Sequence, residues 1–450
     1  MTEASAPPRS EAAGRGGLPE ASLPESLRFA VVGLLPNLVR GLFSPRPAAV
    51  KLLARLDSDG RAVAELAELR RRHGGQGVRL LGGRIAVLWG VEAIREVLDR
   101  SAETYASDAG AKGKGMSHFM PDALTLSRGE EWRDRRAFNE SVLATSESVH
   151  PLAERFVAVV GEEVDRLHLG GGLRWADWEK LFDHITLRVI FGDRSSGDQE
   201  LTGLLESLMA EANRLVGLDG GDDYYALYGR LERKLQDPEE GSLLSRFADA
   251  PQSDRTRVVH QVPHWMFAMR DTLASNTYRA LTAIVADPEV ERRVLEEVDG
   301  TDLSDPSAID GLTYLKGGLS EAMRLWPTTP LLVRETIRET TLAGEKLDEG
   351  TQVMIVNTFN HRDGERVEDA DRFCPERWSS GERDYRFNHL SNGSQDCPGG
   401  PLVYLLGKAV LARILAAYHL TLREEPLDPG EPLPYTLDPF TTSFAAQPRA

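Results

Sequence analysis

One cysteine lies in a glycine-rich loop, HLSNGSQDCPGG at 389–400, directly before a long apolar run. Gly393 and Gly399 flank Cys397 and would let the backbone wrap closely around its sulfur. Backbone N–H groups that point at the sulfur, and the N-terminus of the following helix, would stabilise a thiolate. Such a sulfur suits a metal ion, and haem iron is one metal that accepts a single thiolate. Taken alone, the loop fits a buried structural thiol at least as well.

A second group of residues combines a carboxylate with two arginines. EAMR at 321–324 puts Glu321 and Arg324 three residues apart on one helical face, and DRFCPERW supplies Arg377 about fifty residues later. Two arginines on one glutamate form a rigid buried network when every donor finds an acceptor. An isolated Glu-x-x-Arg pair is more typical of a solvated surface ion pair. We expect the other cysteine, Cys374, to be a small packed side chain and not a ligand.

The order of these motifs resembles the cytochrome P450 family of haem-thiolate monooxygenases. Glu-x-x-Arg is followed by Phe-x-Pro-Glu-Arg-Trp and then by Gly-x-x-x-Cys-x-Gly before a helix. GEEWRDRR, ITLRVIFG and NHRDGERVEDADRFCPERW extend the resemblance over most of the chain. It implies a cytochrome P450-like fold, mainly α with small β-sheets, with one large haem-thiolate catalytic domain over residues 27–450. Residues 1–26, rich in Ala, Pro, Ser, Glu and Gly, are expected to form a mobile N-terminal arm.

The resemblance also implies a cofactor, heme b (iron protoporphyrin IX), with Cys397 as the axial metal ligand. Trp132, Arg136 and Arg334 match the family's partners of the haem propionates. The full set expected to contact the cofactor is Trp132, Arg136, Ala268, Arg334, Leu390, Gly393, Cys397 and Gly399. Glu321, Arg324 and Arg377 are expected to hold the scaffold.

A catalytic acid–alcohol pair is expected within FAMRDTLASN. Counting back from Pro288 places the family's pair at Asp271 and Thr272. A hydroxyl beside the haem can hydrogen-bond dioxygen, and a neighbouring carboxylate with water can relay protons. Without the resemblance, an Asp-Thr step in a helix indicates only a solvated polar face.

Several residues depart from the family's pattern. Met269 stands where glycine is usual, and would narrow the distal pocket or shift the helix bulge. Leu390 replaces a phenylalanine, and Gln395 replaces a histidine or arginine that contacts a propionate. Asp396 sets a negative charge beside the thiolate, which predicts a low reduction potential in the absence of substrate. Alternatively, Gln395 and Asp396 face solvent and have little effect.

The substrate pocket is expected, by resemblance, to have a mostly apolar lining. An apolar pocket with few polar groups fits a small to medium organic molecule. Lys112, Lys114 and His118 could meet an acidic group, although a solvated loop explains them equally well. Residues 108–123 and 215–225 are candidates for a mobile lid. The expected lining residues are Met116, Phe119, Met120, Phe267, Met269, Leu331, Leu332 and Phe440.

The surrounding elements follow from hydrophobic periodicity. A short helix is expected over 61–73, then a hairpin that turns at Gly82 and Gly83, then a helix from residue 90. Residues 103–127 are expected to form a long functional loop. Helices then dominate to about residue 300, with a turn at 219–223, and strands return at 331–358.

The composition is that of a soluble globular protein. The chain has 450 residues, 41% of them hydrophobic and 27% charged, and a net charge of −17 that argues against nucleic acid. Two cysteines and the lack of a secretory pattern favour a cytoplasmic location. Residues 27–43 are too short and too interrupted by Arg28, Pro36 and Arg40 to be a transmembrane segment. They fit a first helix packed on the body, or a peripheral membrane contact.

The expected activity is hydroxylation or epoxidation with O2. Electrons from NAD(P)H would arrive through a separate ferredoxin and ferredoxin reductase, because no reductase domain fits in the chain. RDRR at 133–136, Lys408 and Arg413 offer positive charge for an acidic ferredoxin, unless they pair with neighbouring acids. A peroxide-driven peroxygenase, or a haem isomerase or dehydratase, is the alternative enzyme class. A non-catalytic haem-binding sensor is disfavoured by the acid–alcohol pair. A role in specialised metabolism is expected only because it is common in the family that the chain resembles.

Overall fold

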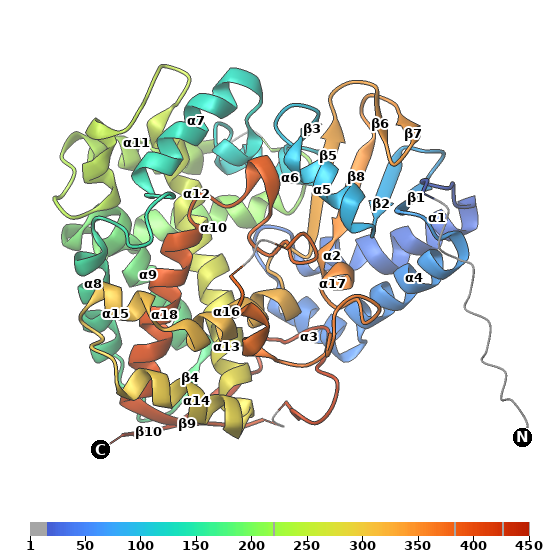
Figure 1. The fold of residues 1–450 in the computed structure, drawn as a ribbon. Helices are drawn as coiled ribbons and strands as arrows, with labels where there is room; N and C mark the ends of the chain where they lie inside the picture. The colour runs from blue at the N-terminus through green and yellow to red at the C-terminus, as the bar shows by residue number, and fades with distance from the viewer. Residues whose placement is uncertain (1–15, 219–220, 382–383, 425–426, 450) are drawn as a thin grey trace, which may run out of the picture.

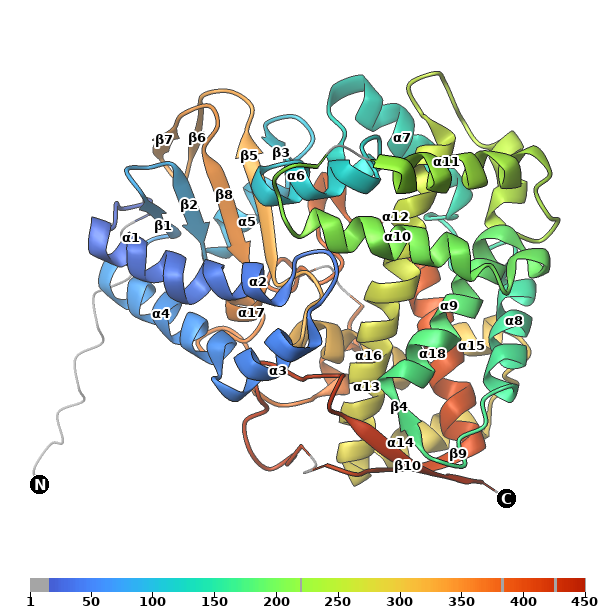
Figure 2. The ribbon, with the colours of Figure 1, turned by 180° about the vertical axis from the view of Figure 1, so that it is seen from behind.

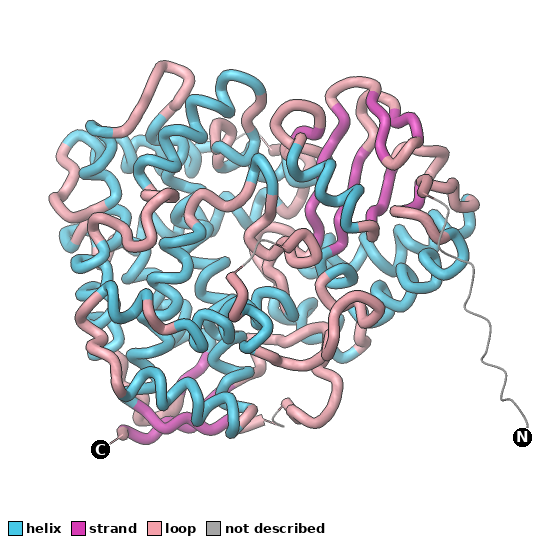
Figure 3. Tube along the Cα trace, viewed as in Figure 1, coloured by secondary structure: helices cyan, strands magenta, loops and turns pink. Residues whose placement is uncertain are grey.

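A computed structural model of the chain describes residues 16–218, 221–381, 384–424 and 427–449. A large helical body lies beside a smaller region built around a β-sheet (Figures 1 and 3). The chain begins in the sheet region, builds most of the helical body, returns to the sheet, and then adds its last long helix to the body. The fold is therefore mainly α with small β-sheets, as the sequence predicts.

The main sheet has five strands in the order β1-β2-β8-β5-β3. The predicted hairpin is present, and Gly82 and Gly83 take φ values of 66° and 82° at its turn, which glycine adopts freely. Strand β8 runs parallel to β2 and antiparallel to β5. Alternate residues of β5 are buried, as expected where one face of a strand meets a core. The strands are β1 (Gly77–Leu80), β2 (Ile85–Leu88), β3 (Tyr105–Ala106), β5 (Leu331–Thr336) and β8 (Gln352–Val356).

Two smaller sheets complete the β structure. The first has the order β4-β10-β9 and joins the end of the chain to the helical body, and the second is the hairpin β6-β7. Their strands are β4 (Leu173–Arg174), β6 (Thr340–Leu342), β7 (Glu345–Leu347), β9 (Tyr418–Leu422) and β10 (Ser443–Pro448).

Residues 16–26, expected within the mobile arm, instead belong to the fold. Leu18 is fully buried. Arg79 of β1 donates its N–H to the Pro19 carbonyl and accepts from the Ala21 N–H, both at 2.8 Å. The edge of β1 offers unpaired backbone groups, and the incoming chain satisfies them. The rest of the expected arm, residues 1–15, lies outside the described residues.

The N-terminal helices flank the sheet. Ser22 caps the first of them and forms a capping box with Glu25. The predicted helix over 27–43 forms as an almost continuous helix made of α1, the π-helical η1 and α2. These elements are α1 (Leu23–Phe29), η1 (Ala30–Leu34), α2 (Leu35–Arg40), α3 (Pro47–Arg55), α4 (Ser58–His73) and α5 (Val91–Asp99).

The helical body surrounds one large apolar core. Its α-helices are α6 (Gly110–Phe119), α7 (Gly129–Val142), α8 (Ala153–Asp165), α9 (Trp175–Phe191), α10 (Gln199–Ala212), α11 (Gly221–Gln236), α12 (Val262–Phe267), α13 (Ala274–Ala286), α14 (Pro288–Asp299), α15 (Pro306–Asp310), α16 (Thr313–Leu325) and α18 (Gly400–Ala417). The short helix α17 (Asn357–Asn360) packs against α4, β5 and β8 of the sheet region and against α16. The short 3₁₀ turns are η2 (Leu124–Leu126), η3 (Asp193–Ser195), η4 (Leu243–Asp249), η5 (Val258–Gln261), η7 (Pro375–Trp378) and η8 (Gly393–Gln395).

Helix α18 is the one helix of the described residues that is long and apolar enough to cross a membrane. Most of its residues are buried inside the protein, and it packs against α8 and α16. Its apolarity is therefore that of a core helix of the protein.

The segment 103–127 is not the structureless loop that the sequence suggests. Residues 110–119 form α6, which packs against α10, and Gly110 starts the helix with a φ of 57°. Three glycines within α6 weaken its helical signal in the sequence. Burial of Met116 and Phe119 against neighbouring helices compensates for the low helix propensity of these glycines. In the predicted turn at 219–223, residues 219 and 220 lie outside the described residues, and α11 begins at Gly221.

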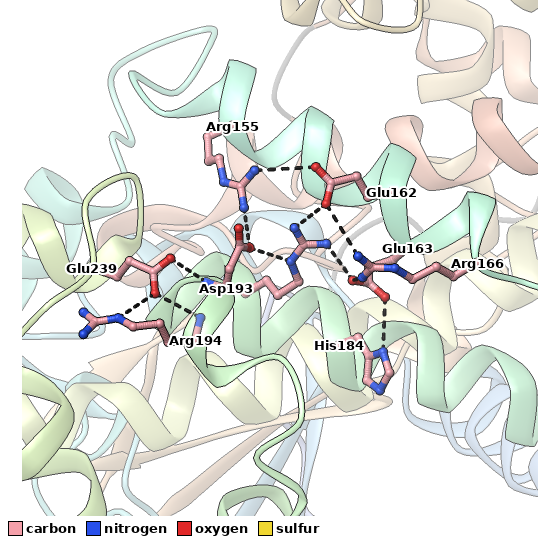
Figure 4. A network of polar contacts seen from close by, with 9 residues as sticks. Arg155, Glu162, Glu163, Arg166, His184, Asp193, Arg194 and Glu239 are labelled. Atoms are coloured by element: carbon pink, nitrogen blue, oxygen red, sulfur yellow. Dashed lines mark hydrogen bonds and ion pairs between the residues drawn. The ribbon is translucent and has the colours of Figure 1, made fainter.

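An ion network joins α8, α9 and η3 (Figure 4). Arg188, almost fully buried, donates to Glu162, Glu163 and Asp193 at 2.5–2.7 Å. Three carboxylates thus satisfy the buried guanidinium, and these charge-assisted hydrogen bonds hold α8 and α9 together. The same acids also contact Arg155, Arg166 and His184.

Candidate active site

Cys397 lies three residues before the start of α18. Its N–H donates to the Leu390 carbonyl at 2.9 Å, and its carbonyl accepts from the Gly400 N–H at 3.2 Å. The Gly399 N–H donates to the sulfur. Neither Cys397 nor Cys374 is in a disulfide. The loop therefore holds one thiol at the start of a core helix and directs a backbone donor at it.

Gly393 accounts for the tight path of this loop. Its φ is 72°, and a Cβ at this position would lie 2.3 Å from the carbonyl carbon and oxygen of Leu98. Ser394 donates its hydroxyl to the same carbonyl at 3.3 Å. Only glycine fits, because both the backbone conformation and the close approach to α5 exclude a side chain.

The pKa of Cys397 is raised. Desolvation by the surrounding protein is the main cause, and the charge of Asp396 adds to it. The Gly399 N–H and Arg136 act in the opposite direction. A thiol in this environment ionises when a cation binds it, which is the behaviour of a cysteine metal ligand.

Arg136 already has partners in the protein. It donates to Glu140 at 2.6 Å, to the Asp396 carbonyl at 2.6 Å and to the Asp396 carboxylate at 2.7 Å. Trp132, one turn earlier on α7, is half-buried. The low reduction potential expected from Asp396 assumed an uncompensated charge beside the sulfur. Arg136 pairs with this carboxylate and opposes its effect on the sulfur, so the charge of Asp396 is partly compensated.

Arg334 is a buried guanidinium without a carboxylate partner among the described residues. Only 4% of it is exposed, and it donates to Ser101 Oγ at 2.9 Å and to the Val333 carbonyl at 3.1 Å. Burial lowers its pKa to about 10. A buried charge of this kind is costly unless an anion pairs with it. A carboxylate-bearing group such as haem therefore fits beside Arg334.

Asp271 and Thr272 lie on a π-helical turn, η6 (Ala268–Leu273), between α12 and α13. Such turns interrupt long helices mostly at functional sites. Both residues are half-buried, and so are Phe267 and Ala268 one turn earlier. Met269, which the sequence places among the substrate contacts, is 7% exposed and belongs to the apolar core of the helical body.

Asp271 carries an unusual carboxyl. Burial raises its pKa to about 7, while the nearby Arg270 opposes the shift. Its Oδ2 is buried and has no hydrogen-bond partner within the described part of the chain. The nearest Arg270 nitrogen is 3.7 Å from its Oδ1. A carboxyl that titrates near neutral pH can both accept and release a proton.

Arg270 is a residue that the sequence analysis missed. It bonds Asp183 of α9 and donates to Glu206 of α10 at 3.2 Å, so it ties the π-helical turn to two neighbouring helices. The sequence signal that could have identified Arg270 is its position, directly before the Asp-Thr pair in an otherwise apolar helix.

Glu321, Arg324 and Arg377 meet as the sequence suggests. Arg324 donates to both Glu321 oxygens, at 2.6 and 2.8 Å, and both residues are fully buried. Arg377 donates to Glu321 at 3.3 Å. Trp378 and the Cys374 N–H, which the sequence analysis did not include, donate to the same carboxylate at 2.9 and 3.1 Å. Arg324 also donates to the carbonyls of His361, Ala370 and Arg372.

The apolar residues expected around a substrate are only partly brought together. The rings of Phe119 and Phe267 lie edge to face, 6.5 Å apart. Phe440 instead packs on Trp175, with ring centres 5.8 Å apart. Met116 and Met120 belong to the body core, while Leu331 and Leu332 contact the two cores of the sheet region. Leu390 is half-buried against the body core.

Two of the basic residues expected to dock a ferredoxin are not on the surface. Lys408 is fully buried and donates to the Asp310 carbonyl at 2.6 Å. Arg135 is also buried, and pairs with Asp122 at 2.9 Å. The expected surface is therefore weaker in positive charge than the sequence implies.

Comparisons with known proteins agree with these motifs. The family model described as Cytochrome P450 matches residues 232–437. The chain is 27% identical over 386 residues to "Cyclooctat-9-en-7-ol 5-monooxygenase" of Streptomyces melanosporofaciens, covering 76% of this chain and 82% of that protein. It is 30% identical over 197 residues to "Probable cytochrome P450 4d20" of Drosophila melanogaster, covering 42% of this chain. It is 28% identical over 258 residues to "Cytochrome P450 monooxygenase sphH" of Aspergillus fumigatus, covering 52% of this chain. The last two matches span only 38% and 46% of those proteins' own length.

Proposed function

This chain belongs to the cytochrome P450 family, and from that premise we propose that it is a haem-thiolate monooxygenase of small to medium organic molecules. It would hydroxylate a C–H bond or epoxidise a C=C bond with O2. Electrons would come from NAD(P)H through a separate ferredoxin and ferredoxin reductase, in the cytoplasm.

One observation carries the proposal: two chemically distinct groups lie on helices that pack together. Cys397 precedes α18, and Asp271 and Thr272 lie on η6. Helix α18 packs against η6 and α13, and a Cβ at its Gly407 would lie 3.5 Å from Leu273 of η6 and 3.4 Å from Thr277 of α13. A thiolate donor and a proton-handling pair are what O2 activation at a haem requires from a protein.

The buried polar groups support haem as the cofactor. Cys397 would bind its iron through the thiolate, and Trp132, Arg136 and Arg334 would hold its propionates. Bound through a thiolate, haem supplies the redox chemistry that cleaves the O–O bond. Thr272, on η6, would supply a hydrogen-bond donor at the reacting site. Asp271, whose pKa of about 7 matches an ordinary working pH, would pass protons to that site.

The relatives support a monooxygenase reaction but leave the substrate open. The Streptomyces protein is named for the 5-monooxygenation of cyclooctat-9-en-7-ol. The half-buried Phe267 and Ala268 beside the acid–alcohol pair favour an apolar substrate for this chain too.

The ferrous–CO spectrum of the haem-loaded protein tests the proposal. A red-shifted Soret band, the signature of thiolate ligation, is expected. Folded, haem-loaded protein without that band would exclude a haem-thiolate enzyme. Turnover with NADPH, ferredoxin and reductase, compared with turnover on hydrogen peroxide, then separates a monooxygenase from a peroxygenase.

Thr272→Ala is expected to uncouple electron use from product formation. The product formed per NADPH should fall on the order of 10- to 100-fold while hydrogen peroxide accumulates, because a positioned proton donor contributes about this much or more. Product, peroxide and NADPH are measured in the same reaction. Ser275→Ala, three residues further along the same half-buried helix, is the matched control and should stay coupled. Equal coupling in Thr272→Ala and the wild type would remove Thr272 from the proton path.

A further inference from the structure

Lys112 differs from the other basic residues of its helix. Lys114 is exposed, and His118 lies 3.1 Å from a carboxylate oxygen of Glu211. Lys112 instead turns inward and donates to Thr125 Oγ1 at 2.6 Å and to the Thr125 carbonyl at 3.4 Å. No carboxylate of the described residues lies within ion-pair distance of its ammonium group.

Lys112 shares its surroundings with Arg334. Desolvation and the charge of Arg334 together lower the pKa of Lys112 to about 7. The nearest acid that acts on it, Asp108, already accepts two hydrogen bonds from Arg128 at 2.9 Å. Geometry agrees: a Cβ at Gly110, where α6 begins, would lie 3.2 Å from Gln352 of β8, which pairs with Glu335, the residue after Arg334 on β5. Within the described residues, neither Lys112 nor Arg334 has an ion-pair partner. Burial of like charges is unfavourable unless a counter-charge joins them.

A third nitrogen base faces the same region. Burial lowers the pKa of His264 on α12 to about 4, and the Lys112 charge contributes. The His264 Nδ1 is buried and has no hydrogen-bond partner within the described chain. Lys112 therefore acts electrostatically on basic groups of both β5 and α12, and no carboxylate of the described residues forms an ion pair with Lys112, Arg334 or His264.

We propose that Lys112 and Arg334 together bind one carboxylate, either a haem propionate or the acidic group of a substrate. The proposal rests on the proposed function. Arg334 is the expected propionate partner, and Lys112 is the new member of the site. It would supply the positive charge that the Cys397 loop lacks, because that loop carries Gln395 in place of a basic residue.

Lys112→Met tests the site in the haem-loaded protein, since methionine keeps the apolar stem and removes the charge. Two quantities are measured: the rate of haem transfer to apomyoglobin, and the affinity for an imidazole that carries a pentanoate chain or the matching amide. Lys114→Met is the matched control, and Lys112→Arg should restore the wild-type values.

A propionate site predicts haem transfer about tenfold faster in Lys112→Met, with equal changes for acid and amide, because a charge-assisted hydrogen bond is lost. A substrate site predicts a loss of about tenfold in affinity for the acid alone. Unchanged haem transfer and unchanged acid preference would overturn the proposal. A missing thiolate band in the wild-type ferrous–CO spectrum would instead defeat the proposed function.

A separate feature is an apolar stripe on the N-terminal helices. Leu23, Leu27, Val31, Leu35 and Leu38 recur every three or four residues along α1, η1 and α2, and are 42–63% exposed. Leu42, Leu52 and Leu56 extend this stripe onto α3 and its flanks. Single exposed leucines are ordinary, but a continuous exposed stripe marks an interaction surface. Figure 2 shows these helices along the outer edge of the sheet region.

Basic residues border the apolar stripe, although the protein as a whole is acidic. Residues 21–56 contain five basic residues and one acidic residue, whereas the chain carries a net charge of −17. Arg28 and Arg40 pair with Glu65 and Asp59 of α4. Arg46, Lys51 and Arg55 are exposed, and none of them has a carboxylate partner within the described residues.

We infer that this face binds an anionic lipid surface, with the helices lying in the plane of the interface. An amphipathic helix with leucines on one face and cations beside it partitions in this way. A second copy of the chain is a poorer occupant, because two-fold symmetry would bring the same cations face to face.

Flotation of the full chain with vesicles tests the inference. Binding is expected to vesicles of phosphatidylcholine with a quarter phosphatidylglycerol, more weakly to pure phosphatidylcholine, and at least tenfold more weakly for the double variant Leu27→Glu and Val31→Glu. Tyr225→Glu removes a still more exposed hydrophobic side chain, 73% against 54% and 60%, from the distant helix α11 and should bind like the wild type. Absence of vesicle binding, or a shift from dimer to monomer in the double variant, would overturn the lipid assignment.

Discussion

Cys397→Ser is expected to abolish the thiolate-type ferrous–CO band and NADPH-driven turnover. Serine keeps the size of the side chain and its place before α18, but a neutral hydroxyl is a poor donor to iron. The loop should still form, because Gly393 and the Leu390 carbonyl hold it through backbone contacts. The CO difference spectrum and a turnover assay on the same haem-loaded sample measure both effects.

Cys374→Ser is the control for this prediction. Cys374 is the other free cysteine, and only its N–H takes part in the Glu321 network, so the serine variant should keep the wild-type spectrum. A thiolate-type band that persists in Cys397→Ser and disappears in Cys374→Ser would transfer the ligand role to Cys374.

Glu321→Gln is expected to lower the free energy of unfolding by about 3–5 kcal/mol, the range for breaking a buried ion pair. Glutamine keeps the shape of the side chain but leaves the fully buried Arg324 without its counter-charge. Its amide also offers one acceptor oxygen where the carboxylate offers two, while Arg324, Arg377, Trp378 and the Cys374 N–H all donate here. Urea unfolding, followed by circular dichroism, gives the change.

Glu289→Gln supplies the comparison. Glu289 also bonds an arginine three residues along its helix, but both side chains are largely exposed. Removal of the Glu289 charge should lower the free energy of unfolding by no more than about 0.5 kcal/mol, since solvent screens an exposed ion pair. Similar losses in the two variants would show that burial does not set the strength of the Glu321 network.

Motif order alone led to the cysteine, the Glu321 network and the acid–alcohol pair. Such residues are recognisable because each chemical role demands particular side chains at a particular spacing. Trp378 belonged to the quoted PERW segment, yet only its contact with Glu321 gives it a role. Lys112 was one of three basic residues in a polar segment, and the sequence could not separate it from Lys114 or His118.

Predictions from local sequence were wrong where tertiary packing outweighed local preference. Three glycines weakened the helical signal of α6, whose stability comes from its contacts with α10. Asp396 looked like an uncompensated charge, because its partner Arg136 is 260 residues away in the chain. Lys408 looked like a surface cation until α18 proved to be a core helix.

The sequence by itself indicated the resemblance to cytochromes P450, predicted the mainly α fold, and proposed Cys397 as ligand and Asp271 with Thr272 as the catalytic pair, because these predictions depend on residue type and on spacing along the chain. The tertiary structure decided which charges are compensated. It paired Asp396 with Arg136, buried Lys408, left Lys112 and Arg334 without an ion-pair partner among the described residues, and exposed a leucine stripe on α1 and α2. Burial and charge pairing depend on distances between segments remote in sequence, and only the folded chain sets those distances.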